Sequence, residues 1–92
     1  MQAEWDEEKC RANFEKHGLS FEDAWQVLTG DTLTILDERY DYGENRLITL
    51  GRLEGRVVVV VHVARGENIR IISMRKANAR EQEIYQKRLG QG

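Results

Sequence analysis

Five consecutive valines, Val57–Val61, restrict the fold of this 92-residue sequence more than any other feature. Side chains along a β-strand point alternately to opposite faces, so a strand made of these residues is apolar on both sides. A strand of that kind lies in the middle of a sheet and is covered on each face by other elements. The run is also the longest apolar stretch, and it is much shorter than the roughly 18 residues of a membrane-spanning helix, so we expect no membrane span.

Other strand-like segments predict an antiparallel sheet around this strand. The four predicted strands are Thr32–Leu36, Arg46–Leu53, Arg56–Ala64 and Asn68–Met74. Glu54-Gly55 predicts a two-residue hairpin loop between the second and third strands, and Arg65-Gly66 predicts a similar turn after the third. The polar segment Asp37–Asn45, which contains a glycine, is predicted to be a loop.

Capping residues and glycines delimit three predicted helices, which are Glu7–His17, a segment between Ser20 and Gly30, and Ala79–Leu89. Asp6 caps the first helix, and Gly18 ends it. Ser20 with Asp23 and Asn78 with Glu81 have the spacing of capping boxes. The order α-α-β-β-β-β-α predicts one α+β domain over residues 1–92, with a mainly antiparallel four-stranded sheet flanked by helices.

The two hairpin loops predict which strand residues are paired. A loop at 54–55 pairs Leu47 with His62, and a loop at 65–66 pairs His62 with Ile69. One predicted face then carries Thr49, His62, Ser73 and Arg75, and the other carries Arg46, Ile48, Leu50, Val59, Val61, Arg70, Ile72 and Met74. Arg70 and Arg75 are an odd number of residues apart, so they converge only if the strand contains a bulge or ends before Arg75.

Charge is distributed unevenly along the chain. Residues 1–45 carry twelve acids and four bases, whereas residues 46–92 carry ten bases and four acids. Eight of those ten bases are arginines, whose planar guanidinium groups suit bidentate contacts to phosphate. The asymmetry points to a polyanion or an acidic partner for the basic half, and attraction between the two halves within the fold is the structural alternative.

His62 and His17 are the two histidines and the candidates for proton transfer. His62 lies late in an apolar strand, where a neutral, hydrogen-bonded core histidine is the alternative to catalysis. His17 ends a predicted helix, where a cation is favoured by the helix dipole, so capping also explains it.

Several basic residues are candidates for phosphate binding. Arg70, Arg75 and Lys76 form a cationic stretch next to a predicted helix N-terminus, which is a setting that attracts phosphate. Lys9, Asn13 and Lys16 follow helical spacing on one side of the first helix. The structural alternative for both groups is a solvated surface. Tyr85 is expected to pack in the core, or to stack on a base if it is exposed.

Other chemistry is not indicated. The single cysteine, Cys10, excludes an internal disulfide framework and is typical of a cytoplasmic protein with a reduced thiol. Neither histidine has cysteine or carboxylate partners at ligand spacing, so we expect no metal. The sequence has no glycine-rich phosphate loop and no nucleophile elbow, so we expect no cofactor.

Four motifs, spread over about residues 5–85, are specific when they are taken together. They are Trp5-Asp6-x-x-Lys9-x-x-x-Asn13-x-x-Lys16-His17-Gly18 followed by Ser20-Phe21 and Ala24, Arg46 leading into Gly51, Val-Val-His62 followed by Arg65-Gly66, and Arg70-Ile-Ile-Ser73-x-Arg75-Lys76-Ala77 running to Glu81 and Tyr85. In this order and at these distances they resemble the BrnT-type toxins. Cys10 and Met74 are mild departures from the family pattern.

The resemblance implies a RelE-like fold and the toxin half of a bacterial type II toxin–antitoxin pair. Such toxins are RNA endonucleases that arrest translation. The implied partners are RNA and a small antitoxin with a DNA-binding fold, which neutralises the toxin. Operator DNA is then contacted only through the complex with the antitoxin, which represses its own promoter.

The resemblance also implies roles for particular residues. A metal-independent cleavage needs a group that takes the proton of the RNA 2′-hydroxyl and cations that neutralise the phosphate, and it leaves a 2′,3′-cyclic phosphate. The residues expected to act are His62 or His17 for proton transfer, Arg70 and Arg75 for the phosphate, Lys9, Lys16, Arg46 and Lys76 for the RNA strand, and Tyr85 for a base. The alternative from another class is a non-catalytic interaction module, or an inactive toxin, that binds an antitoxin-like partner and co-represses its operon.

Overall fold

The computed structural model describes residues 2–38 and 43–90 and has the predicted α+β architecture. Its strands are β1 (Ala3–Glu4), β2 (Leu33–Leu36), β3 (Arg46–Leu53), β4 (Arg56–Arg65) and β5 (Asn68–Lys76). Its helices are α1 (Glu7–His17), the 3₁₀ turn η1 (Phe21–Asp23), α2 (Ala24–Leu28) and α3 (Ala79–Tyr85), which continues as a π-helical turn, η2 (Gln86–Gly90). Residues 39–42 of the predicted loop Asp37–Asn45 lie outside the described ranges.

The sheet has five strands in the order β1-β5-β4-β3-β2, so the prediction of four strands was wrong. The additional strand, β1, pairs in parallel with β5, and Ala3 lies opposite Ile69. Two residues are too few to show the alternation of apolar and polar residues that identifies a strand in a sequence. This pairing depends on a contact between distant parts of the chain.

The valine run forms the middle of the sheet, as predicted. In β4, Val58, Val59 and Val60 are almost completely buried. Val58 and Val60 belong to one core cluster with Phe21 of η1, whereas Val59 belongs to a second cluster on the other face of the sheet. Both faces of this strand are covered by other elements, as its apolar side chains on both sides require.

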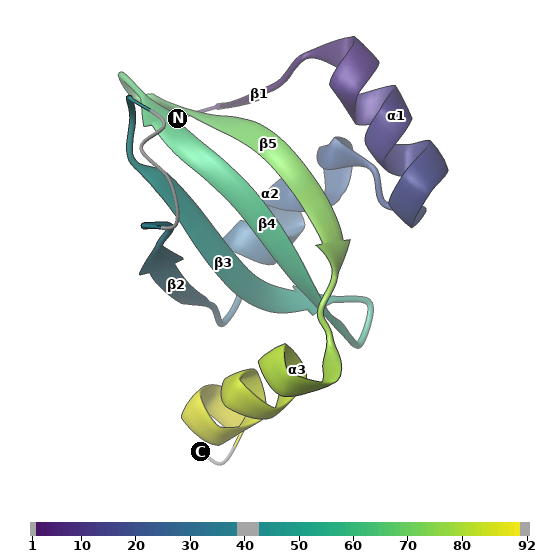
Figure 1. The fold of residues 1–92 in the computed structure, drawn as a ribbon, viewed down its shortest axis with the longest axis vertical. Coiled ribbons are helices and arrows are strands. Elements are labelled where there is room, and N and C mark those ends of the chain that lie inside the picture. The colour runs from purple at the N-terminus through teal and green to yellow at the C-terminus, as the bar shows by residue number, and fades with distance from the viewer. Residues whose placement is uncertain (1, 39–42, 91–92) are drawn as a thin grey trace.

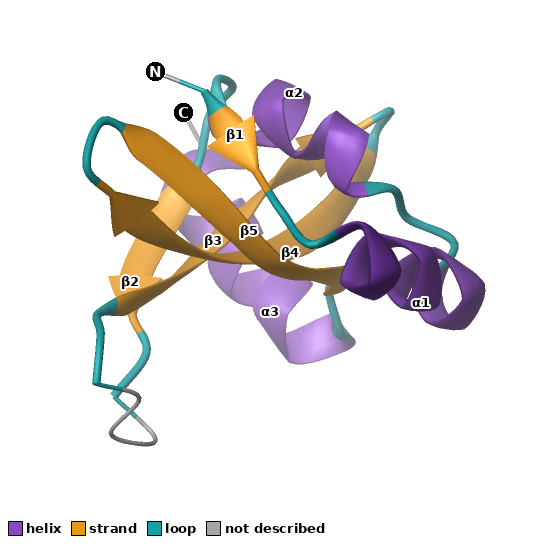
Figure 2. Ribbon diagram, turned by 90° about the horizontal axis from the view of Figure 1, so that it is seen from above, coloured by secondary structure: helices purple, strands orange, loops and turns teal. Residues whose placement is uncertain are grey.

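Helices cover the two faces of the sheet unequally, as Figures 1 and 2 show from two directions. One core cluster contains side chains of α1, η1 and α2, and we call the sheet face that it covers the α2 face. The other contains Tyr85 of α3, and we call that face the α3 face. Helix α1 lies beside β5 rather than over the middle of the sheet.

Local capping explains how α1 and α3 begin. The carboxylate of Asp6 accepts from the backbone N–H groups of Glu8 (2.9 Å) and Lys9 (3.2 Å), and Gly18 ends α1 in the left-handed conformation at φ 71°. Asn78 and Glu81 form the predicted capping box at the start of α3.

The second predicted helix differs from the prediction at its start. Ser20 accepts from the N–H of Glu22, but Asp23 makes no side-chain capping bond, so the predicted capping box does not form. The first turn is a separate 3₁₀ turn, and α2 contains only five residues.

Gly51 lets α2 approach β3 closely. A Cβ atom at this position would lie 2.8 Å from Cγ1 of Val27 and 3.2 Å from Cγ2 of Thr32. Real side chains essentially never come that close, so a side chain here would displace either the helix or the strand. The glycine in the Arg46-to-Gly51 motif therefore has a packing explanation.

The first hairpin follows the predicted register, with Leu47 opposite His62 and Thr49 opposite Val60. Both loop residues, Glu54 and Gly55, have positive φ, which is the conformation of the favoured two-residue hairpin turn.

The register predicted for the second hairpin was wrong. Its two-residue loop is Gly66-Glu67 rather than Arg65-Gly66, and His62 lies opposite Ile71 rather than Ile69. Gly66, at φ 58°, is the first residue of the turn rather than the second, which shifts the pairing by two residues. A β-bulge follows, because Val61 is opposite Ser73 and Ile72 is left between the two registers.

Within the described residues, no helix has both the length and the apolar character that crossing a membrane requires.

Candidate functional site

Three arginines lie on the α3 face of the sheet, and the bulge in β5 brings one of them, Arg75, to it. Arg46 and Arg70 both lie opposite Val63, and Arg75 lies opposite Val59. Paired residues of antiparallel strands point to the same face, so all three side chains lie on the face that carries Val59 and Val63. We call this surface the arginine face.

The prediction that Ser73 and Arg75 share a face with His62 was therefore wrong. Beyond the bulge, each residue of β5 points to the face opposite to the one expected from a regular strand. Met74 accordingly lies in the core cluster of the α2 face, and it was predicted on the other side. The one-residue irregularity has no signature in the sequence Ile71-Ile72-Ser73.

Arg46 and Arg70 flank a buried valine. Val63 is 1% exposed, and both arginines are half-buried beside it. Directly opposed residues on neighbouring strands have Cβ atoms roughly 5 Å apart, so the stems of both arginines pack along Val63. Arginine stems that lie on apolar surface are held in place, so both guanidinium groups are fixed on this side of the sheet, and the Nε atom of Arg46 is itself buried.

Arg75 is held by an ion pair at the other end of the arginine face. Its two terminal nitrogens donate to the two carboxylate oxygens of Glu81, each at 2.8 Å. The hydrogen bond from Arg75 lowers the pKa of Glu81, and a hydrogen bond from the N–H of Asn78 lowers it further. The Arg75 guanidinium is thus fixed against the start of α3 and partly neutralised there.

Helix α1 adds basic residues beside β5. The side-chain amide of Asn13 donates to the carbonyl oxygens of Met74 (2.9 Å) and Leu19 (3.1 Å), and its oxygen accepts from the N–H of Met74 (3.2 Å). Lys9 and Lys16 are exposed and lie about 40° and 60° from Asn13, on the same side of it around the helix. The stripe predicted as a solvated surface thus includes one residue, Asn13, that closes the outer edge of β5.

The direction of α1 places His17 near the end of β5. The positive charges of Lys9 and Arg70 contribute to the lowered pKa of Asp6, after the backbone N–H groups of Lys9 and Glu8 as the main causes. Asp6 therefore lies near Arg70, and Asn13 contacts Met74, so α1 runs parallel to β5. With rises of about 1.5 Å and 3.3 Å per residue, the partly exposed His17 is about level with Lys76.

His62 is on the opposite face of the sheet from the arginines. It is 6% exposed, and its Nε2 is 2.8 Å from the hydroxyl of Thr49, which is itself 2.8 Å from the hydroxyl of Thr34. Burial lowers the pKa of His62 below its ordinary value. These are the properties of the neutral, hydrogen-bonded core histidine that the sequence analysis gave as the alternative to catalysis.

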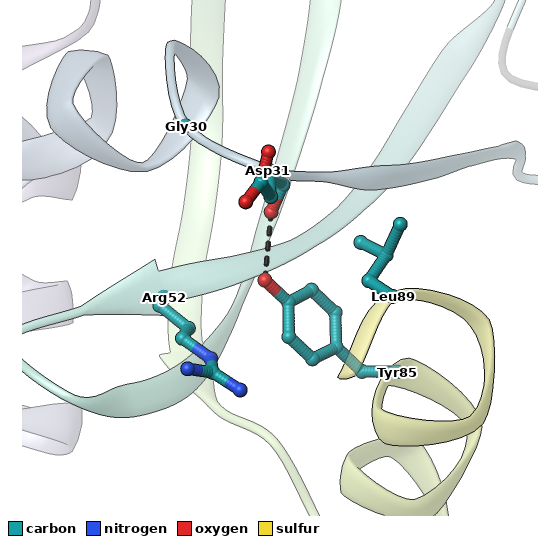
Figure 3. Close-up of a pocket in the computed structure, with 5 residues that line it drawn as sticks. All are labelled: Gly30, Asp31, Arg52, Tyr85 and Leu89. Atoms are coloured by element: carbon teal, nitrogen blue, oxygen red, sulfur yellow. Dashed lines mark hydrogen bonds between the residues drawn. The ribbon is translucent and has the colours of Figure 1, made fainter. Parts of the chain in front are cut away.

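Tyr85 is part of the core rather than an exposed ring. It is 2% exposed, its hydroxyl donates to the backbone oxygen of Asp31 at 2.7 Å, and the Arg52 guanidinium lies 5.7 Å from the ring centre. Figure 3 shows these side chains around a hollow of about 320 Å³, which Gly30 and Leu89 also line. The structure therefore agrees with packing, and it offers no ring face for stacking a base. Sequence reasoning gave no role to Arg52.

Metal ligands do not gather in the part of the chain that the structure describes, where no three His, Cys, Asp or Glu side chains form a group that could hold an ion.

Lys76, another residue predicted for the RNA strand, is exposed and lies opposite Val58, on the α2 face. The bulge therefore separates Lys76 from its neighbour Arg75.

Comparison with known proteins gives one family match. The family model described as "Ribonuclease toxin, BrnT, of type II toxin-antitoxin system" matches residues 5–81 of this chain. No curated protein sequence matches it. The matched range includes α1, the four strands β2 to β5 and both residues of the Arg75–Glu81 ion pair.

Proposed function

The chain belongs to the BrnT family of ribonuclease toxins of type II toxin–antitoxin systems, and from this premise we propose that it cleaves RNA on the arginine face without a metal ion. We also propose that the chain arrests translation, that it acts in the cytoplasm and that residues 1–92 form a single toxin domain. The RelE-like fold implied by the resemblance remains a prediction.

The observation that carries the proposal is that Arg46, Arg70 and Arg75 all lie on one face of the sheet. Cleavage of RNA passes through a phosphorane that carries more negative charge than the starting diester. Guanidinium groups held in place before the reaction stabilise that charge without reorganising. Arg70 and Arg75 are the residues proposed to contact the phosphate, and Arg46 extends the contact along the RNA strand.

The nucleophile is supplied by the substrate, because the RNA 2′-hydroxyl attacks its own phosphate. The 2′-oxygen forms a bond to phosphorus while the bond to the 5′-oxygen of the next nucleotide breaks. The proton of the 2′-hydroxyl passes to a base, and the leaving 5′-oxygen takes a proton from an acid. The products are a 2′,3′-cyclic phosphate and a 5′-hydroxyl, and no step needs a metal-bound water.

His17 is the histidine that the arrangement favours for proton transfer. It is partly exposed at the end of α1, beside the strand that carries Arg70 and Arg75, whereas His62 is buried on the opposite face. A general base must come within hydrogen-bonding distance of the proton that it removes, and His62 meets that requirement only if the sheet itself is displaced. Lys9 and Lys16 lie on the same helix and are proposed to guide the RNA strand. Lys76, on the α2 face, has less support.

The experiment that tests this proposal is a cleavage assay with the purified chain and a 5′-labelled single-stranded RNA. We expect products ending in a 2′,3′-cyclic phosphate, and we expect EDTA to leave the rate unchanged. Arg70→Glu and His17→Gln should each lower the rate by a factor of about 10² or more, which is the loss typical of removing a charge-stabilising or proton-transferring group.

Two variants serve as controls in the same assay. His62→Gln changes the other histidine, and Arg88→Gln changes an exposed arginine in η2 that lies outside the sheet. Both should cleave at close to the parent rate. Loss of activity on chelation would exclude the metal-independent mechanism, and a large loss in His62→Gln alone would move the proton-transfer role to that residue.

The alternative, a non-catalytic module that binds a protein partner, is favoured by one observation. Arg75 is already paired with the carboxylate of Glu81, which lowers its capacity to bind a phosphate. Under this alternative, the chain expressed without its antitoxin does not arrest growth, and Arg70→Glu changes only the affinity for the partner. Growth arrest by the parent and survival with Arg70→Glu would favour the ribonuclease.

A further inference from the structure

We propose that the antitoxin docks in an apolar groove on the side of α1 away from Lys9 and Lys16, through a basic amphipathic segment. The inference rests on the antitoxin partner that membership of the family implies, and it does not depend on the RNA mechanism proposed above. It assigns RNA and antitoxin to two different surfaces of the toxin.

The groove consists of two adjoining hollows of about 360 Å³ each between α1, β1 and the η1–α2 segment. They share Trp5 and Glu22, so they form one continuous depression, which we call the aromatic groove. Its apolar lining residues are Ala3, Trp5, Cys10, Phe14, Phe21 and Trp25. On its floor the Trp5 and Phe21 rings pack edge to face with their centres 6.3 Å apart.

Two large aromatic side chains in the groove remain exposed. Phe14 is 56% exposed and Trp25 is 41% exposed, on either side of the shared residue Trp5. Single exposed apolar residues are common on protein surfaces, but several that line one depression mark a binding surface. Aromatic residues beside a preformed hollow are also the residues that most often dominate the binding energy of protein interfaces.

The helical geometry of α1 separates this groove from the basic residues. Successive residues are about 100° apart around a helix, so Phe14 lies on the opposite side of Asn13 from Lys16. Cys10 and Asn13 face the core and the edge of β5, with Phe14 on one flank and Lys9 and Lys16 on the other. The helix therefore presents an aromatic flank and a basic flank.

Charge identifies the kind of occupant. Glu7 and Glu22 line the groove, where Arg11 is the cationic lining residue among those described. Residues 1–45, which supply the whole lining, carry twelve acids and four bases. This setting repels an RNA backbone and attracts cationic side chains. A helix with an apolar stripe and basic flanks satisfies both the aromatic floor and the acidic rim, which is the helix-in-groove mode of recognition.

The test measures the affinity of the purified chain for its antitoxin, which is the product of the partner gene of the same toxin–antitoxin pair. Phe14→Ala and Trp25→Ala should each weaken binding about 30-fold or more, mainly through faster dissociation, as truncation of a central aromatic residue does. The matched control is Ile84→Ala, which removes an apolar side chain of similar exposure (42%) from α3. It should leave the affinity within about 2-fold of the parent.

The charge contribution is tested by a second set of variants. Glu7→Gln with Glu22→Gln should slow association and make it less sensitive to salt, because charges at the rim of an interface act mainly on the association rate. The glutamine oxygen at position 7 can still accept the hydrogen bond from the Trp5 indole N–H, which Glu7 accepts at 3.0 Å. Arg11→Glu should have the opposite effect and speed association. Glu83→Gln, an exposed carboxylate on α3, is the control.

The outcomes separate this inference from its competitors and from the ribonuclease proposal. Unchanged affinity in both Phe14→Ala and Trp25→Ala, with loss of binding in Arg70→Glu, would place the antitoxin on the arginine face and overturn the inference. A free chain that is dimeric, becomes monomeric in Phe14→Ala and keeps its affinity for the antitoxin would assign the groove to a second copy. RNA cleavage by the groove variants is expected at the parent rate, so the absence of cleavage in the parent bears on the ribonuclease proposal alone.

Discussion

Arg75 and Glu81 form a two-point ion pair that joins the end of β5 to the first turn of α3, with both N–O distances at 2.8 Å. Glu81 also accepts from the N–H of Asn78 at 2.9 Å, so one carboxylate serves as the capping residue of α3 and as the partner of Arg75. Glu81 therefore stabilises the fold, but it also competes with a phosphate for Arg75.

Glu81→Gln is expected to lower stability and to improve RNA binding. Glutamine keeps an acceptor for the Asn78 N–H but loses the charge, and a partly exposed ion pair of this geometry is worth about 1 kcal/mol. Arg75 then binds the phosphate more strongly, because the competing carboxylate charge is gone. Urea unfolding at pH 7 and RNA titration measure the two effects. Lower affinity for RNA in this variant would show that Arg75 acts only through Glu81.

The same ion pair gives stability a dependence on acid. The folded-state pKa of Glu81 is lowered from an ordinary value of 4.5, so its contribution is present above pH 4.5 and is lost as the pH falls through the folded pKa. Parent and Glu81→Gln should therefore become equal in free energy of unfolding at acidic pH. A constant difference at all pH values would contradict the assignment.

His62 should make the protein less stable as the pH falls from 7 towards 5. Burial lowers its folded-state pKa below the ordinary 6.5, so the unfolded chain binds a proton that the folded chain does not. The contribution is present in full above about pH 6.5 and declines below it. Thermal unfolding of His62→Gln should show a flatter pH dependence over this interval than that of the parent.

Gly51→Ala should destabilise the fold by about 1–3 kcal/mol, because the added methyl group would lie 2.8 Å from Cγ1 of Val27. Shortening Val27 to alanine removes that atom. The double variant Val27→Ala/Gly51→Ala should therefore lose less stability than the sum of the two single losses. Chemical unfolding of all four proteins gives the coupling energy, and strict additivity would show that another contact limits position 51.

Charge reversal on the arginine face should weaken RNA binding in a salt-dependent way. Arg46→Glu and Arg70→Glu should each lower the slope of log affinity against log salt concentration by about 1, as the loss of one phosphate contact does. Binding measured from 50 to 300 mM salt tests this. An equal change in Arg88→Gln would indicate that net charge, rather than the arginine face, controls binding.

The sequence predicts most elements of this fold because their signals are local. The valine run, the cap residues Asp6 and Asn78, and the Glu54-Gly55 turn each act within a few residues, and each occurs where it was predicted. Strand β1 and the close packing at Gly51 depend on residues far away in the chain, so no local pattern indicates them. Gly66 is the first rather than the second residue of its turn, so the strand pairing in the second hairpin differs from the predicted register by two residues.

The sequence predicted which residues belong to the candidate site, but it did not predict how they are arranged in space. The sequence identified the arginines and both histidines, but it placed Arg75 with His62 on one face. The bulge at Ile72 and the ion pair with Glu81 are tertiary properties, and so is the burial of Tyr85. Asn13 was grouped with a solvated stripe because a side chain that completes the edge of a strand has the same helical spacing as one that faces water.

The unpaired position at Ile72 has a consequence for engineered and natural variants of this chain. Deleting that single residue would leave Arg70 and Arg75 an even number of residues apart, so a regular strand would still carry both guanidinium groups on one face. With the odd spacing of the present chain, the shared face exists only because the bulge does. A substitution that straightens this stretch of β5 at unchanged length would therefore turn the two arginines to opposite faces of the sheet, although neither arginine is altered.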